Sequence, residues 1–219
     1  SKIFSKLSRE ITVAAKLGAK DPESNPRLRT AIQAAKQSNM PKDNIARAIS
    51  KSEMNTDQNY QNLRYEGFGP NNVALIIEIL TDNKNRAASN IRTILEKNGG
   101  RMGVSGSTSH LFSPCGVIHV DKKFALEEEM IDTAINAGAK DCLNLVDCYE
   151  IISEKEDFYK VKSTLEKKIN NFSYSGIEWR PHNYLEVSKE QSEKILQMLE
   201  KLDENEDVQN TFINCKINL

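Results

Sequence analysis

Residues 73–80 read Val-Ala-Leu-Ile-Ile-Glu-Ile-Leu, and this stretch decides the class of fold. The run is almost continuously apolar and rich in β-branched side chains, which is typical of a buried strand. A helical pattern follows at 85–98 and ends at Gly99 and Gly100, because glycine is the usual residue after a helix C-terminus. A buried strand followed by an amphipathic helix predicts a sheet covered by helices.

On the C-terminal side of this strand, further strands and helices alternate. The first two expected strands, at 108–112 and 116–120, lie on either side of a break at Pro114 and Cys115. Further strands are expected at 148–152, 177–179, 184–187 and 208–217. Helices are expected at 126–137, 157–169 and 188–202. If residues 142–146 count as a weak strand, 116–184 has the strand–helix–strand–strand–helix–strand order of a ferredoxin-like unit.

On the N-terminal side, the pattern changes to three amphipathic helices. The first covers 2–17, with Ile3 among its inward residues, the second begins at Asn25-Pro26, and the third ends near Lys51. Residues 52–61 are polar and unpatterned, so we expect a protease-sensitive linker there.

These patterns predict an α+β fold with an N-terminal three-helix bundle and two α+β domains, one ferredoxin-like and inserted in the other. The expected domains are 1–57 for the helical bundle, 58–114 with 185–219 for the discontinuous α+β domain, and 115–184 for the insertion. Because 116–184 already forms a complete unit, the strands before it and the helix and strand after it are expected to pair with each other.

Composition is typical of a cytoplasmic protein with a well-solvated surface. Charged residues make up 28% of the chain, and no apolar run approaches the length that spans a bilayer. The four cysteines, Cys115, Cys142, Cys148 and Cys215, form no Cys-x-x-Cys pair and have no histidine at ligand spacing. They therefore favour reduced thiols, and we expect no metal and no cofactor.

The net charge of −1 conceals an asymmetry along the chain. Residues 1–57 carry eleven Lys and Arg against six Asp and Glu, a net charge of +5, and residues 58–219 carry a net charge of −6. A basic segment attached to an acidic body indicates that one end of the protein meets a polyanion.

The candidate nucleic-acid-binding residues lie mainly on the three N-terminal helices. At helical geometry Lys2, Lys6, Arg9 and Lys16 share one side of the first helix, and Arg29, Lys36, Arg47 and Lys51 extend the basic surface; Lys84 and Arg86 stand at a later helix start. Two simpler interpretations stay open. The eight cations from Lys2 to Lys51 can form an ordinary solvated face of the helical bundle, and the segment around Lys84 and Arg86 can serve only to cap a helix.

Neither glycine cluster predicts nucleotide chemistry. Residues 99–106 follow a helix rather than a strand and lack a Gly-Lys-Ser/Thr sequence, which favours a helix cap and a flexible loop. Residues 65–70 favour a turn, with an exposed recognition loop as the alternative. Ser109 and His110 have no evident orienting carboxylate, and His119 falls in an expected strand. We therefore expect no enzymatic activity.

Specific motifs in order along the chain resemble the YebC family. They are the run KIFSKLSREITVAAKLGAKDPESNPRLRTAIQAAKQSNMPKDNIARAI at 2–49, then 65–70, Thr-Asp-Asn-Lys-Asn-Arg at 81–86, Asn-Gly-Gly at 98–100 and Asp-Val-Gln-Asn at 207–210. The resemblance covers almost the whole chain and implies the three-domain organisation given above. The family typically begins with a further basic stretch that this sequence lacks, so contacts made by that stretch are not carried over.

The resemblance implies a regulator of gene expression without catalytic activity, most simply a DNA-binding transcriptional regulator. Since a mitochondrial relative is a translational activator, the first alternative is a translation factor that meets rRNA or tRNA on the ribosome. The second alternative is a protein–protein adaptor that works through its acidic α+β domains. The expected partner is nucleic acid rather than a membrane, and the oligomeric state is left open, with a monomer favoured.

Overall fold

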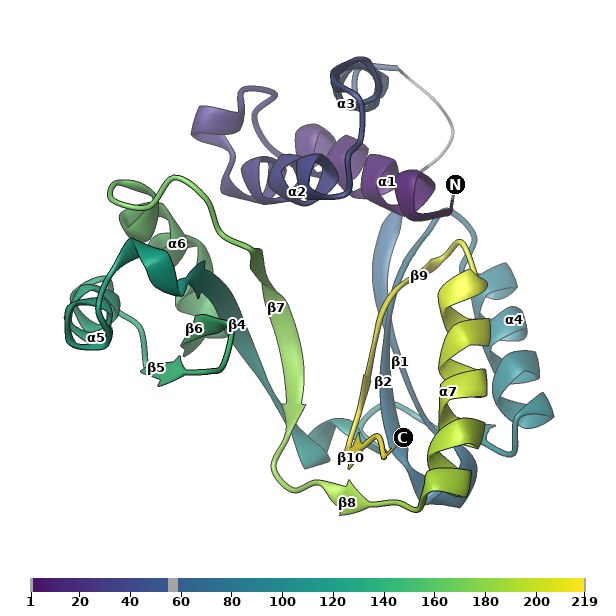
Figure 1. Cartoon of the computed structure of the whole chain (residues 1–219). Coiled ribbons are helices and arrows are strands. Elements are labelled where there is room, and N and C mark those ends of the chain that lie inside the picture. The colour runs from purple at the N-terminus through teal and green to yellow at the C-terminus, as the bar shows by residue number, and fades with distance from the viewer. Residues whose placement is uncertain (1, 55–58, 219) are drawn as a thin grey trace. The chain divides into compact units, whose positions relative to one another are not determined.

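The computed structural model describes residues 2–54 and 59–218, and its mixture of helices and mainly antiparallel sheets confirms the α+β prediction (Figure 1). The helices are α1 (Lys2–Leu17), α2 (Pro26–Gln37), α3 (Lys42–Lys51), α4 (Lys84–Lys97), α5 (Glu127–Asn136), α6 (Phe158–Glu166) and α7 (Lys189–Glu204). The strands are β1 (Gln61–Phe68), β2 (Ala74–Thr81), β3 (Arg101–Met102), β4 (Phe112–Asp121), β5 (Asp141–Asn144), β6 (Cys148–Glu154), β7 (Tyr174–Pro181), β8 (Leu185–Glu186), β9 (Val208–Ile213) and β10 (Cys215–Lys216).

The chain forms two compact units, each built from separate segments. Unit 1 comprises Ser1–Arg9, Met54–Ser113 and Trp179–Leu219, and unit 2 comprises Glu10–Glu53 and Pro114–Glu178. The division into three domains, with the boundaries predicted above, stays a prediction.

The three N-terminal helices form as the sequence predicts. The Asn25 side chain accepts a hydrogen bond from the Leu28 backbone N–H (3.0 Å) and donates one to the Ala14 carbonyl (2.9 Å), so it caps α2 and ties its start to α1. Ile11, Leu28 and Ile45 of the three helices are buried, but the expectation for Ile3 is wrong, since it is 60% exposed, and Leu17 at the other end of α1 is 70% exposed.

Helix α2 packs against α6 through a buried lysine of unit 2. Lys162 is only 1% exposed, and its Nζ donates to Thr30 Oγ1 (2.7 Å) and Gln33 Oε1 (2.6 Å). Burial lowers the pKa of Lys162 to about 8, because a charged ammonium loses its hydration there.

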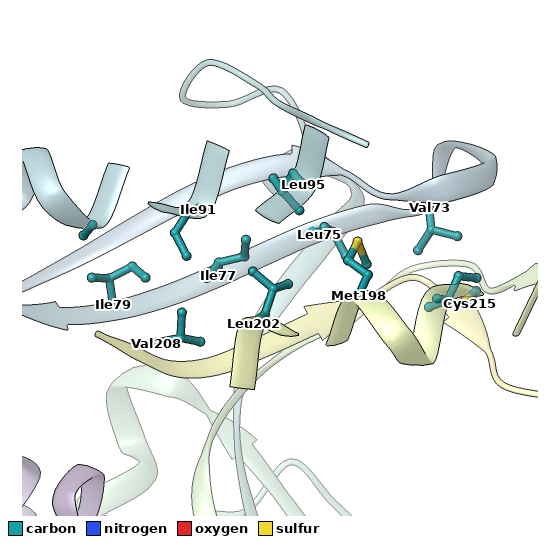
Figure 2. Packing of buried hydrophobic residues seen from close by; sticks show 12 residues of the cluster. Val73, Leu75, Ile77, Ile79, Ile91, Leu95, Met198, Leu202, Val208 and Cys215 are labelled. Carbon is teal, nitrogen blue, oxygen red and sulfur yellow. The ribbon is translucent and has the colours of Figure 1, made fainter. Parts of the chain in front are cut away.

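The sheet of unit 1 has the order β3-β1-β2-β9, and β2 pairs antiparallel with both neighbours. On one face Leu75, Ile77 and Ile79 enter the core with α4 and α7 (Figure 2). On the other face Ala74 and Ile76 pack with a second apolar group around Phe112 and Trp179. Burial on both faces is the reason that residues 73–80 are almost continuously apolar.

The sheet of unit 2 has the order β5-β6-β4-β7, with the core formed under α5 and α6. The element order β4-α5-β5-β6-α6-β7 is the ferredoxin-like order predicted for this region, and β5 takes the place of the weak strand.

The sequence prediction missed β1 and β3. The sequence pattern predicts a linker up to residue 61 and a turn at 65–70, but residues 61–68 form β1, which pairs along its whole length with β2. Leu63 and Tyr65 alternate with polar residues, so the strand has only a weak apolar pattern. The predicted loop at 99–106 contains β3, which pairs with β1. Residues 55–58 of the expected linker lie outside the described residues.

Two expected strand boundaries are also wrong. Strand β4 continues through Pro114, and its pairing with β6 begins only at Cys115, so the missing proline N–H costs no bond in that ladder. The expected strand at 208–217 is divided at Asn214, whose Oδ1 accepts a hydrogen bond from the Ala74 N–H (2.8 Å).

Candidate nucleic-acid interface

Several predicted cations of the helical segment remain exposed. Lys16 lies in the last turn of α1, Lys36 in the last turn of α2, and Arg47 and Lys51 lie on α3. Arg47 and Lys51 are four residues apart and therefore share one side of α3. None of the four forms an ion pair with another residue of the described ranges 2–54 and 59–218.

Arg29 differs from these residues because its guanidinium is used within unit 2. Its Nε donates to Glu166 Oε2 (2.8 Å), its Nη2 to Ser163 Oγ (3.1 Å), and its Nη1 to the Pro22 carbonyl (2.8 Å). The side chain is 17% exposed. Arg29 thus joins α2 to α6.

Lys6 and Arg9, at the start of α1, contact the C-terminal part of unit 1. Lys6 Nζ is hydrogen-bonded to the backbone carbonyl of Asp203 and lies 3.4 Å from its carboxylate. Burial lowers the pKa of Lys6, although the Asp203 carboxylate opposes this shift. Arg9 Nη1 donates to the Leu80 carbonyl (2.8 Å) and to Asp207 Oδ1 (3.1 Å), and its guanidinium lies over the Tyr60 ring.

Arg86 shares the carboxylate of Asp207 with Arg9. Its Nε and Nη2 donate to the two oxygens of Asp207 (3.1 and 2.8 Å), and Nη2 also donates to Asp82 (2.8 Å). These bonds, that to Asp207 first, raise the pKa of Arg86. Burial alone would raise the pKa of Asp207, but hydrogen bonds from Arg86 hold it below its ordinary value.

The segment around Lys84 caps a helix, as one interpretation predicted. Asn83 Oδ1 accepts a hydrogen bond from the Arg86 backbone N–H (3.0 Å) at the start of α4. Lys84 itself is exposed, as is Lys2 at the start of α1. Of the ten predicted cations, six are therefore exposed without an ion pair to a described residue, and Lys6, Arg9, Arg29 and Arg86 are ion-paired.

Sequence reasoning missed three relevant side chains. Lys42 is a further exposed cation in the first turn of α3, and its place on the same helix as Arg47 and Lys51 could have identified it. Glu66 and Asp207 lie in motifs of the family resemblance, but nothing local indicated their roles, because their partners lie far away in the sequence.

Glu66 organises the glycine-rich loop that follows β3. Its buried carboxylate accepts hydrogen bonds from the backbone N–H groups of Gly106 (2.7 Å), Thr108 (3.0 Å) and Ser109 (2.6 Å). Burial alone would raise the pKa of Glu66, yet the three N–H groups lower it to about 2. The loop N–H groups at these positions are directed at a protein carboxylate, so they are not available to cradle a phosphate.

Across 2–54 and 59–218, no three His, Cys, Asp or Glu side chains are arranged to hold a metal ion. Among the helices of the described residues, none combines the length and the apolar character that a bilayer crossing requires. The four cysteines form no disulfide bond within the described residues, and burial raises the pKa of Cys142, Cys148 and Cys215.

Comparison with known proteins gives concordant matches along the chain. Residues 1–55 match the family described as "TACO1/YebC protein N-terminal domain", and residues 60–215 match "TACO1/YebC second and third domain". The chain is 54% identical over 214 residues to the "Probable transcriptional regulatory protein SAR11_0592" of Pelagibacter ubique (strain HTCC1062), covering 98% of this chain and 89% of that protein. It is also similar to the crystal structure of the conserved hypothetical protein Aq1575 from Aquifex aeolicus, with a TM-score of 0.84, 40% identity, and coverage of 100% of this chain and 90% of that one.

Proposed function

We propose that this chain, which belongs to the TACO1/YebC family, regulates gene expression by binding nucleic acid, in the first place as a DNA-binding regulator of transcription. The resemblance to YebC proteins expected from the sequence is confirmed by the family matches. The 54% identical relative is named a probable transcriptional regulatory protein, which supports the regulatory role. The proposal includes a cytoplasmic location and the absence of catalysis, both of which stay predictions.

The observation that carries the proposal is the charge left on the helical segment once its ion pairs are formed. In residues 2–54, six exposed cations have no ion pair with a described residue: Lys2, Lys16, Lys36, Lys42, Arg47 and Lys51. Only three carboxylates of residues 2–54 are likewise exposed without an ion pair to a described residue, those of Asp21, Glu23 and Asp43. The segment therefore keeps a surplus of positive charge for a polyanion to neutralise.

Within this surplus, α3 is the element that we place against the phosphate backbone. Arg47 and Lys51 lie on one side of it, and Lys42 stands in its first turn. The proposal assigns a smaller role in phosphate binding to the four ion-paired cations, because a phosphate would have to compete with their carboxylate partners. These cations are Lys6, Arg9, Arg29 and Arg86. No recognisable sequence-reading element accompanies α3, so we expect contacts that position the protein rather than specify a base sequence.

The test is a binding comparison with promoter DNA, random DNA and purified ribosomes at several fixed salt concentrations. For a phosphate-binding surface, log K falls linearly with log salt, with a slope of about −0.7 to −0.9 per neutralised phosphate. The variant Arg47→Glu/Lys51→Glu should weaken binding to both DNAs about equally and flatten the slope by about 1.4 to 1.8, the amount for two phosphate contacts.

The matched control is Lys194→Glu/Lys201→Glu, which changes the net charge equally on the exposed side of α7. It should leave the slope unchanged. If both variants lose the same affinity for DNA, the loss is due to net charge alone, and α3 is rejected as the contact element. Preference for promoter DNA supports transcriptional control, and preference for ribosomes supports the translation factor instead. Binding to none of the three rejects both, and in that case a partner retained after nuclease treatment would favour the protein adaptor.

A further inference from the structure

One stretch of unit 2 exposes an unusual number of large apolar side chains. Within the described residues, six of the 13 exposed large hydrophobic side chains fall between positions 124 and 146: Phe124, Leu126, Ile135, Leu143, Leu145 and Val146. Leu126 is 80% exposed and Val146 is 90% exposed. Single exposed apolar residues are ordinary on protein surfaces, but a cluster of them marks an interaction site.

Hydrogen bonds bring the two ends of this stretch together. Asn144 Nδ2, at the end of β5, donates to Glu127 Oε2, at the start of α5 (2.9 Å), and the chain neighbours of this pair are Leu145 and Leu126. The Tyr149 hydroxyl donates to the Ala125 carbonyl (2.9 Å), which holds the segment before α5 to β6. We call Phe124, Leu126, Leu145 and Val146 the apolar patch.

The geometry of the patch is fixed rather than loose. The Leu145 N–H donates to the Cys148 carbonyl (2.9 Å), so a tight turn presents Val146 at its tip. Side chains on a preorganised turn lose little conformational freedom when a partner covers them. The patch can therefore bind without first having to fold.

Acidic residues surround the apolar patch. Those on α5 and on the β5–β6 hairpin are all exposed: Glu127, Glu128, Glu129, Asp132, Asp141 and Asp147. The nearby cations are Lys122, Lys123 and Lys140; Lys123 lies over the Phe124 ring, and Lys140 pairs with Glu154. A surface with this excess of carboxylates repels nucleic acid and anionic lipid, and it attracts a positively charged partner.

We propose that the apolar patch and its acidic rim dock a basic segment of a partner protein that carries apolar anchor side chains. The anchors cover Leu126 and Val146, and the Lys and Arg residues of the partner meet the carboxylates of α5. The N–H of Cys142 on the edge strand β5 is already bonded to Asp141 Oδ1 (2.8 Å), so docking proceeds through side chains rather than by addition of a strand. This surface is independent of the basic residues of α3.

The probe for the test is a fluorescein-labelled synthetic peptide of Leu and Lys that forms a basic amphipathic helix. Binding to the full chain is followed by fluorescence anisotropy, and the site is mapped by backbone NMR shifts. The variant Leu126→Ser/Val146→Ser should bind at least tenfold more weakly, which corresponds to about 1.4 kcal/mol. The matched control Val104→Ser/Leu185→Ser replaces exposed apolar residues of unit 1 and should bind as the unmodified chain does. Both pairs are exposed, so neither replacement threatens the fold.

Two further peptides complete the design, one with Glu in place of Lys and one with Ser in place of Leu, and both should bind at least tenfold more weakly than the Leu–Lys peptide. Equal binding of the patch variant, or NMR shifts outside residues 124–147, would overturn the proposal. So would equal binding of the Glu peptide, since charge complementarity would then play no part. If the patch variant instead abolishes a concentration-dependent dimer or binding to phosphatidylglycerol vesicles, the occupant is a second copy or a membrane, and the proposal is wrong.

Discussion

Replacing Asp207 with Ala should lower the free energy of unfolding of unit 1 by about 3 kcal/mol. The carboxylate is 3% exposed and accepts three hydrogen bonds from Arg9 and Arg86. Removing one partner of a buried pair costs about 3–5 kcal/mol, because the remaining charge keeps its desolvation penalty. The lower end applies here, since Arg86 is 43% exposed and keeps Asp82, and Arg9 keeps the carbonyl of Leu80.

The assay is urea unfolding at neutral pH, followed by the fluorescence of Trp179, the only tryptophan, which lies in unit 1. The control is Asp203→Ala, whose carboxylate is 82% exposed and pairs with Lys6. The Asp203 carboxylate is solvated although the Lys6 side chain is only 12% exposed, and Lys6 keeps the backbone carbonyl at position 203, so this loss should stay below about 1 kcal/mol. If the two variants lose the same stability within about 0.5 kcal/mol, Asp207 does not hold this region together and the reasoning is refuted.

Three further predictions concern pH and backbone contact. The pKa of Glu66 lies below its unfolded value, at about 2, so the stability that its carboxylate contributes is present above about pH 4.3 and is lost as the pH falls towards 2. The difference in free energy of unfolding between the unmodified chain and Glu66→Gln should therefore shrink between about pH 4.3 and about 2. A constant difference would contradict this assignment. The pKa of Lys162 is lowered to about 8, so burial of its charge costs stability below pH 8. Between pH 8 and about 10.4 the folded chain holds fewer protons than the unfolded chain, so the unmodified chain should gain stability relative to Lys162→Met. Urea unfolding followed by circular dichroism measures this difference. A Cβ at Gly100 would lie 2.1 Å from the Phe68 carbonyl oxygen, so Gly100→Ala should lower the urea midpoint by an amount equivalent to about 1–3 kcal/mol, and an unchanged midpoint would show that β1 and β3 can separate without cost.

Elements with a strong local pattern were predictable from the sequence. The helix expected at 188–202 is an example, because Ser188 and Gln191 at its start have the sequence of a capping box, and both hydrogen bonds of that box are present. Strand β2 was predictable because both of its faces are buried. Strand β1 was not, since its identity comes from pairing with β2 rather than from its own alternation of Leu63 and Tyr65 with polar residues.

The candidate site was predictable only as a distribution of charge. Helical periodicity places Lys6 and Arg9 on the basic side of α1, but it contains no information about the carboxylates that approach them. Their partners, Asp203 and Asp207, are 197 and 198 residues away in the sequence. Arg29 and Glu166 are separated by 137 residues in the same way. Whether a surface cation is available to a ligand is therefore a tertiary property.

The opposite charges of two surfaces in unit 2 restrict what each of them can bind. A polyanion that gains from contact with Arg47 and Lys51 on α3 is repelled by the carboxylates at the start of α5. The exposed Leu126 and Val146 consequently sit where nucleic acid is disfavoured, and neither DNA nor RNA explains them. A basic protein satisfies both the apolar and the acidic groups there. Proteins that work on nucleic acid are themselves commonly basic, so a regulator with these two surfaces would bind nucleic acid through α3 and a basic protein through the apolar patch.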